Sequence, residues 1–171
     1  MSRRTGADTV ATDGRRRTRR PTLAAMSTTA LEALDALRAA ASDGRLAALC
    51  HGHGLDLVTA FGSAVRASRA GVDGDGRPPR DLDVAVRFAV PGGDLVGVVT
   101  DLCALLAWDA VDVMDLSRAG VVARSRALGP GAEPLFEAAP GRYARAQMAA
   151  LTTEMETERM RRRDLELLAD R

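Results

Sequence analysis

Three acidic residues and a Gly-Ser pair have the types and spacing that could do chemistry. Gly62 and Ser63 follow the apolar run 57–61, and Asp81 and Asp83 lie in a second apolar run downstream. Because successive residues of a strand point to opposite faces, Asp81 and Asp83 share one face. Two carboxylates about 4 Å apart repel by about 4 kcal/mol at an effective dielectric constant near 20, so the pair is costly without a cation. Magnesium, which prefers hard oxygen ligands and keeps phosphate oxygens in its shell, would neutralise it.

A third carboxylate lies in a later strand-like run. Asp112 alternates with Val111 and Val113, which places it opposite the apolar face, whereas Asp115 falls on the other face. A carboxylate on an adjacent strand is suited to hold a metal over an attacking hydroxyl and to accept its proton. We therefore predict that Asp81, Asp83 and Asp112 are the catalytic residues and the ligands of two magnesium ions.

The Gly-Ser pair predicts a phosphate-binding turn. Gly62 permits a sharp backbone turn, and the Ser63 hydroxyl and the amides of the next helix can then face phosphate oxygens. Arg66 either binds the triphosphate as well or is an ordinary exposed helix arginine. A Gly-Ser after a strand is by itself more often a plain turn, and Asp-x-Asp also marks a solvated strand face. All three elements in this order are more specific.

Periodicity and turn residues predict the elements that must position these side chains. Thr29 and Glu32 form a capping box, which begins a first helix that runs to about Ala41. Strands are expected at 56–61, 81–90, 110–116 and 135–136, with helices at 94–106 and 118–128 and a long helix from Gly141 to the end. Residues 64–70 predict a helical turn, and the Gly- and Asp-rich stretch 71–79 predicts a loop.

Composition indicates one folded domain with a basic tail. The chain has 171 residues, which suits a single domain, and all 24 of its basic residues are arginine. Residues 1–25 contain seven arginines and two aspartates, so the remaining residues carry a net charge of about −4. We expect 1–25 to be a disordered tail, with Met26 as an alternative start. The charge disfavours nucleic-acid binding except through that tail, which could instead contact an acidic partner.

The remaining patterns indicate a cytoplasmic protein without a structural metal site. Cys50 and Cys103 lack metal-type spacing and are expected to be buried free thiols, which fits a reducing compartment. No apolar stretch approaches the roughly eighteen residues needed to cross a bilayer. His51 and His53 have no partner cluster, and histidine is favoured at a helix C-terminus in any case, so they are not predicted as ligands.

Together these motifs resemble the minimal nucleotidyltransferase (MNT) group of the DNA polymerase beta superfamily. The resemblance rests on Phe61-Gly62-Ser63, Asp81-Leu82-Asp83-Val84-Ala85-Val86 and Val111-Asp112-Val113-Met114-Asp115-Leu116, and it covers roughly residues 29–140. It implies an α+β fold with a small mixed sheet flanked by helices. It also implies a nucleotidyltransferase domain over 27–140 and a helix over 141–171 that packs on the domain or on a partner.

The resemblance implies a function as well. Gly62, Ser63 and Arg66 would bind ATP, and a hydroxyl would attack its α-phosphate with release of pyrophosphate. The acceptor would be a HEPN-type ribonuclease toxin, for which the chain would serve as antitoxin. Two alternatives remain open: transfer to a small molecule such as an aminoglycoside, or a catalytically silent module that binds a partner. The sequence departs from the family in a longer connector before Asp81 and in Ala64, where an arginine is common.

Overall fold

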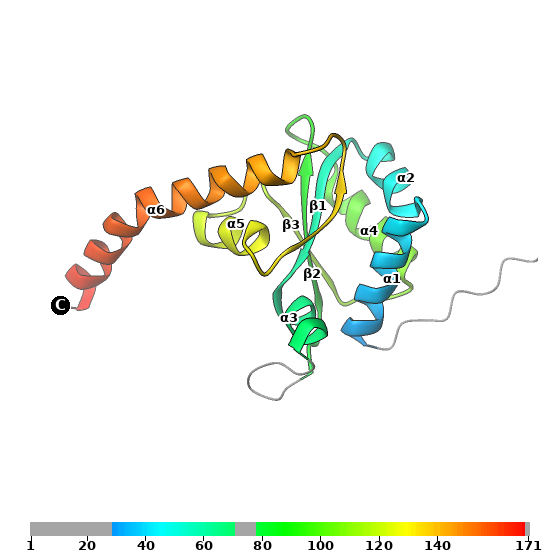
Figure 1. The fold of residues 1–171 in the computed structure, drawn as a ribbon, viewed down its shortest axis with the longest axis horizontal. Helices are drawn as coiled ribbons and strands as arrows, with labels where there is room; N and C mark the ends of the chain where they lie inside the picture. The colour runs from blue at the N-terminus through cyan, green and yellow to red at the C-terminus, as the bar shows by residue number, and fades with distance from the viewer. Residues whose placement is uncertain (1–28, 71–77, 170–171) are drawn as a thin grey trace, which may run out of the picture.

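The computed structural model describes residues 29–70 and 78–169 as a four-stranded sheet with helices on both faces (Figure 1). The predicted basic tail 1–25 and most of the predicted loop 71–79 lie outside the described residues. In chain order the elements are α1 (Ala30–Ser42), α2 (Arg45–Gly52), β1 (Leu55–Phe61), α3 (Gly62–Ala70), β2 (Leu82–Phe88), α4 (Leu95–Leu106), β3 (Val111–Asp115), α5 (Val121–Leu128), β4 (Glu133–Glu137) and α6 (Arg142–Ala169).

The sheet has the strand order β3-β2-β1-β4 and mixes both pairing directions. β1 pairs antiparallel with β2 and with β4, whereas β2 and β3 run parallel. The long connection between β2 and β3 contains α4, as a parallel crossover requires. The predicted fold class, an α+β domain with a small mixed sheet and a C-terminal helix, is confirmed.

One face of the sheet forms the main core with α1, α2 and α4. Leu82, Val84 and Val86 of β2 are fully buried there beside Val58 and Ala60 of β1, which confirms the predicted inward face of the second strand. The Thr29–Glu32 capping box begins α1 as predicted. Cys50 is buried in this core as predicted, whereas Cys103 of α4 is only partly buried, so the prediction of a buried thiol is wrong for Cys103.

The other face of the sheet is covered by α5 and the first part of α6. Leu57 and Ala85 from the sheet pack there against Leu128 of α5 and Ala150 of α6. The rest of α6 extends away from the domain (Figure 1). Consequently this face is closed over its middle, and the strand ends near α3 remain accessible. Among the described helices, none is long and apolar enough to span a membrane.

Candidate active site

The turn from β1 into α3 brings its backbone directly against a carboxylate of β2. Gly62, the first residue of α3, has φ +80°, a left-handed conformation that L side chains rarely adopt. A Cβ atom at position 62 would lie 1.9 Å from Asp83 Oδ2. The Ser63 amide donates a hydrogen bond to the Asp83 carboxylate. Gly62 is therefore required both by its backbone conformation and by the close approach of Asp83.

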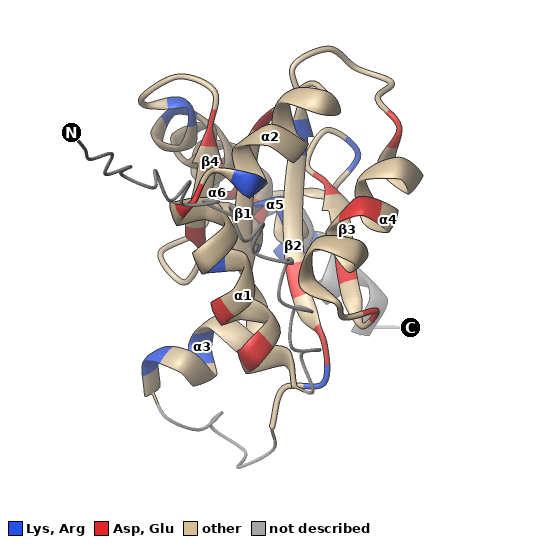
Figure 2. Cartoon of the chain, turned by 90° about the vertical axis from the view of Figure 1, so that its right-hand side faces the viewer, with Lys and Arg blue, Asp and Glu red and all other residues tan. Residues whose placement is uncertain are grey.

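Strand register places the acids in a row on one face of the sheet. Asp83 is the Cα partner of Phe61 in the antiparallel β1–β2 pair and of Asp112 in the parallel β2–β3 pair. Paired residues project to the same face, and neighbouring strands lie about 4.8 Å apart, so the two carboxylates are adjacent. Figure 2 shows acidic segments side by side on β2 and β3.

Asp81 was predicted to lie in the second strand, but it lies outside that strand. It lies in a bend just before β2, because strand pairing begins only where Leu82 is opposite Val111. Asp81 is exposed, and it still acts on Asp83 through its charge. The predicted strand 81–90 also ends earlier than expected, at Phe88.

The pKa of Asp83 shows how these groups interact. Partial burial raises the pKa of Asp83, and the negative charges of Asp81 and Asp112 raise it further. The hydrogen bond from the Ser63 amide and the charge of Arg66 act in the opposite direction. Burial and the neighbouring negative charges therefore both disfavour the ionised form of Asp83, which a bound cation would favour.

The donor set suits magnesium, but the side chains are not assembled around an ion. Within residues 29–70 and 78–169, no group of three or more His, Cys, Asp or Glu side chains is arranged closely enough to hold a metal. Asp83 and Asp112 are adjacent, and all three acids offer the oxygen ligands that magnesium prefers. Metal ligation by Asp81, Asp83 and Asp112 therefore remains a prediction that the chemistry of the cluster supports.

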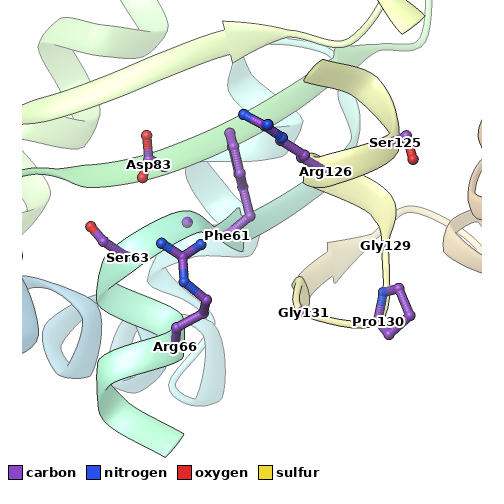
Figure 3. Close-up of a pocket in the computed structure, with 10 residues that line it drawn as sticks. Phe61, Ser63, Arg66, Asp83, Ser125, Arg126, Gly129, Pro130 and Gly131 are labelled. Carbon is purple, nitrogen blue, oxygen red and sulfur yellow. The ribbon is translucent and has the colours of Figure 1, made fainter. Parts of the chain in front are cut away.

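A cavity of about 720 Å³ opens in front of Asp83 (Figure 3). One wall carries Gly62, Ser63 and Arg66 at the start of α3, with Phe61 and Asp83 from the sheet. This volume lies within the usual range of roughly 300 to 1,000 Å³ for small-molecule sites. The predicted nucleotide-binding residues Gly62, Ser63 and Arg66 thus line the same cavity as Asp83.

The opposite wall was not predicted from the sequence. It consists of Ser125 and Arg126 near the end of α5 and the turn Gly129-Pro130-Gly131 that follows (Figure 3). By its residue types alone, this turn indicates only the end of a helix. In a chain whose 24 basic residues are all arginine, no local signal distinguishes Arg126 from the others.

Side chains from α3 and α6 hold the backbone of this second wall through hydrogen bonds. Arg69 donates hydrogen bonds to the carbonyls of Pro130 and Ala132, both at 3.3 Å. The Tyr143 hydroxyl lies 3.0 Å from the Leu128 carbonyl and 3.2 Å from that of Gly129. Since Arg69 belongs to the helix that begins at Gly62, the two walls are tied together.

The histidines lie away from the cavity. His53 Nε2 is 2.7 Å from Asp101 Oδ2, and the His51 ring packs edge-on against Phe136. Both side chains thus have structural partners within the domain.

Comparison with solved structures identifies the fold. No protein-family model and no curated protein matches the chain. A variant of the MntA toxin–antitoxin pair, in which two aspartates separated by a single residue are changed to glutamate, matches with a TM-score of 0.57 at 16% identity. The match covers 74% of this chain and 98% of that chain.

Two further toxin–antitoxin structures give the same picture. One contains AMP-PNP and matches with a TM-score of 0.57 at 18% identity, covering 74% of this chain and 98% of that one. The other is a tri-AMPylated HEPN toxin from Shewanella oneidensis in complex with its MNT antitoxin. It matches with a TM-score of 0.56 at 17% identity, covering 77% and 98%. The chain therefore has the fold seen in these MNT toxin–antitoxin structures, as the sequence resemblance implied.

Proposed function

We propose that this chain is a magnesium-dependent nucleotidyltransferase that transfers AMP from ATP to a hydroxyl of a HEPN-type toxin, for which it acts as antitoxin. The observation that carries the proposal is the contact between Asp83 and the Gly62-Ser63 turn, with Asp112 in the adjacent strand position. This arrangement joins a turn suited to phosphate binding to Asp83 in one cavity, with Asp112 adjacent on β3 although neither it nor Asp81 lines the cavity.

The structural neighbours support the nucleotide and the toxin partner of the proposal. The AMP-PNP complex indicates that the fold accommodates an adenine nucleotide, and the tri-AMPylated toxin indicates protein adenylylation in such a pair. The aspartates changed in the MntA variant have the same spacing as Asp81 and Asp83 here.

The residues of the cavity can be given roles in this reaction. The amides at the start of α3 and the Ser63 hydroxyl would hold phosphate oxygens, and Arg66 would add positive charge. Asp81, Asp83 and Asp112 would hold magnesium, which supplies charge neutralisation when bound. The oxygen of the acceptor hydroxyl would bond to the α-phosphorus while the bond to the departing pyrophosphate breaks. Asp112 would accept the proton that this hydroxyl loses.

The C-terminal helix provides a surface for the partner protein. Ala150 is buried against the domain, whereas Met148, Met155 and Met160 are 70%, 75% and 64% exposed. Methionine side chains adapt to irregular partner surfaces, and exposed apolar clusters commonly mark protein interfaces. We assign this part of α6 to docking of the toxin, which would present its hydroxyl to the cavity.

Transfer can be tested with ATP labelled in its α-phosphate, magnesium, the full chain and a HEPN toxin. Label should appear on the toxin with the wild type and with Asp109→Asn, an exposed aspartate outside the cluster, but not with Asp83→Asn. A stable complex without label would favour the silent binding module. Label on an added aminoglycoside, with none on the toxin, would favour the small-molecule enzyme.

A further inference from the structure

A second hollow, of about 260 Å³, lies on the other side of α5 from the catalytic cavity. It is enclosed by α5, α6 and the ends of β2 and β3, and it shares no lining residue with the catalytic cavity. Its polar lining consists of Arg87, Ser117, Arg124 and Thr153. None of the roles proposed above uses this hollow.

The positive charge of Arg87 is only partly compensated. Its Nε donates to Asp56 Oδ1 at 2.7 Å, and Nη2 lies 3.2 Å from Oδ2. Arg142 donates to the same Oδ2 oxygen, so two guanidinium groups share one carboxylate. The Asp56 side chain is only 6% exposed, which limits screening of this group by water. Asp56 therefore balances only one of the two positive charges of Arg87 and Arg142, and Arg87 is the one of the two that lines the hollow.

Arg124 contributes a second cation, with one unsatisfied donor. Its Nη2 donates to the Ala119 carbonyl at 2.9 Å. Its Nε is buried and has no hydrogen-bond partner within the described part of the chain. A buried donor without an acceptor costs roughly 1 to 3 kcal/mol, so Arg124 would gain from an acceptor in the hollow that reaches Nε.

The lining also favours an anion over a cation. Among the described residues, no aspartate or glutamate lines the hollow, whereas the catalytic cavity includes Asp83. Arginine pairs favour planar or tetrahedral oxyanions, to which they donate two parallel hydrogen bonds. The charge, the donors and the volume together define a small anion site.

We propose that the hollow between α5 and α6 binds a phosphate-class oxyanion through Arg87 and Arg124. The same chemistry is offered by inorganic phosphate, by pyrophosphate and by the phosphate of AMP. The bound anion would bridge β2, through Arg87, to α5, through Arg124, and so stabilise the packing of α5 and α6 on the sheet.

Ala149 offers a way to test the site without removing an arginine. It is exposed, lies on α6 and lines the hollow. Ala149→Glu would place a carboxylate where the anion binds, and Ala149→Gln is the control of equal size without charge. Calorimetric titration of the full chain with inorganic phosphate, without magnesium, should show binding to the wild type and to Ala149→Gln. Ala149→Glu should weaken it at least about tenfold and should raise the melting temperature in phosphate-free buffer, because the new carboxylate satisfies Arg124.

Further variants distinguish phosphate bound in the hollow from phosphate bound in the catalytic cavity. Arg66→Gln should retain the phosphate binding that Ala149→Glu removes, and Arg124→Gln should lose it. The Arg118 side chain is 80% exposed, and Arg118→Gln should bind phosphate as the wild type does. Titrations with pyrophosphate and AMP identify which source binds most tightly. The proposal is overturned if Ala149→Glu and Arg124→Gln bind all three anions as tightly as the wild type. Because no toxin and no transfer are involved, this result is independent of the proposed enzymatic activity.

Discussion

Asp83 occupies the space that a side chain at position 62 would need, since a Cβ atom there would lie 1.9 Å from Asp83 Oδ2. The contact joins the Gly62-Ser63 turn to the acidic row. It also explains why glycine stands at this position of the chain, where φ is +80°.

Gly62→Ala should cost more stability than backbone strain alone, and it should displace Asp83. Gly44 is a matched control, because it has φ +87° and a Cβ atom added there would meet no atom within 4 Å. Gly44→Ala should lower the free energy of unfolding by about 1 kcal/mol. Gly62→Ala should lower it further and weaken binding of magnesium-ATP at least about tenfold. Urea unfolding and nucleotide titration measure both, and equal effects of the two substitutions would contradict the role of the contact.

Asp83→Asn should stabilise the folded protein at neutral pH. A carboxyl whose folded-state pKa is raised destabilises the fold once it ionises. The effect is absent below the ordinary aspartate pKa, grows as pH rises toward the raised pKa of Asp83 and is complete above it. The difference in unfolding free energy between Asp83→Asn and wild type should therefore appear across this acidic window and then level off. Asp109→Asn, the control, should show no such step.

Magnesium should act through the same carboxylates. At neutral pH, added magnesium should raise the melting temperature of the wild type, because it relieves repulsion among Asp81, Asp83 and Asp112. Asp83→Asn and Asp112→Asn should lose most of this increase. Equal increases in wild type and variants would place the metal elsewhere.

Arg126→Ala should weaken nucleotide binding without loss of stability. Arg126 is exposed on the wall opposite Ser63 and extends from α5 toward the side where Phe61 lies (Figure 3). Loss of one charge-assisted hydrogen bond, worth about 1.5 to 3 kcal/mol, corresponds to roughly tenfold or more in affinity. Arg118→Ala on the outer surface serves as the control. Unchanged ATP affinity in Arg126→Ala would show that this wall does not contact the nucleotide.

Tyr143→Phe should loosen the second wall of the cavity. The hydroxyl bonds to Leu128 and Gly129 would be lost, although Gln147 still donates to the Leu128 carbonyl at 2.7 Å. The free energy of unfolding should fall by about 0.5 to 1.5 kcal/mol. Nucleotide affinity should fall as well, because the turn at Gly129 becomes less well held. A stability loss without any change in affinity would separate this wall from the site.

The exposed methionines of α6 can be tested separately from catalysis. Replacing Met148 and Met155 by serine should leave the free energy of unfolding within about 0.5 kcal/mol, since both side chains are exposed. Affinity for the toxin should fall at least about tenfold. Val90→Ser, an exposed apolar residue at the other end of β2, should leave the affinity unchanged. Wild-type affinity in the double variant would remove α6 from the proposed interface.

Local patterns were sufficient for most elements and for the orientation of Asp83 and Asp112, but not for Asp81. Alternation along β2 and β3 correctly placed Leu82 and Val84 in the core, and Asp83 and Asp112 fall on the opposite face. The Thr29 capping box and Asp94, whose Oδ1 accepts from the Gly97 amide at 3.0 Å, marked two helix starts. These signals depend only on neighbouring residues.

The rest of the site depends on contacts between distant segments. Alternation does not say that β2 and β3 run parallel, yet that register is what sets Asp83 beside Asp112. Arg126 reaches the cavity because α5 packs on the sheet and β4 returns to pair with β1. The bend at Asp81 likewise follows from where pairing with β3 begins. Neither periodicity nor turn chemistry encodes such long-range packing.

The row formed by Phe61, Asp83 and Asp112 exists only in the folded sheet. These residues are neighbours only while β1, β2 and β3 are paired in register, and a slip of one residue would turn Asp83 inward among aliphatic side chains. Unlike a site built on separate loops, this one is lost when the pairing of β1, β2 and β3 is lost. Amide hydrogens of β2 should exchange with solvent at the same denaturant concentration at which ATP binding disappears.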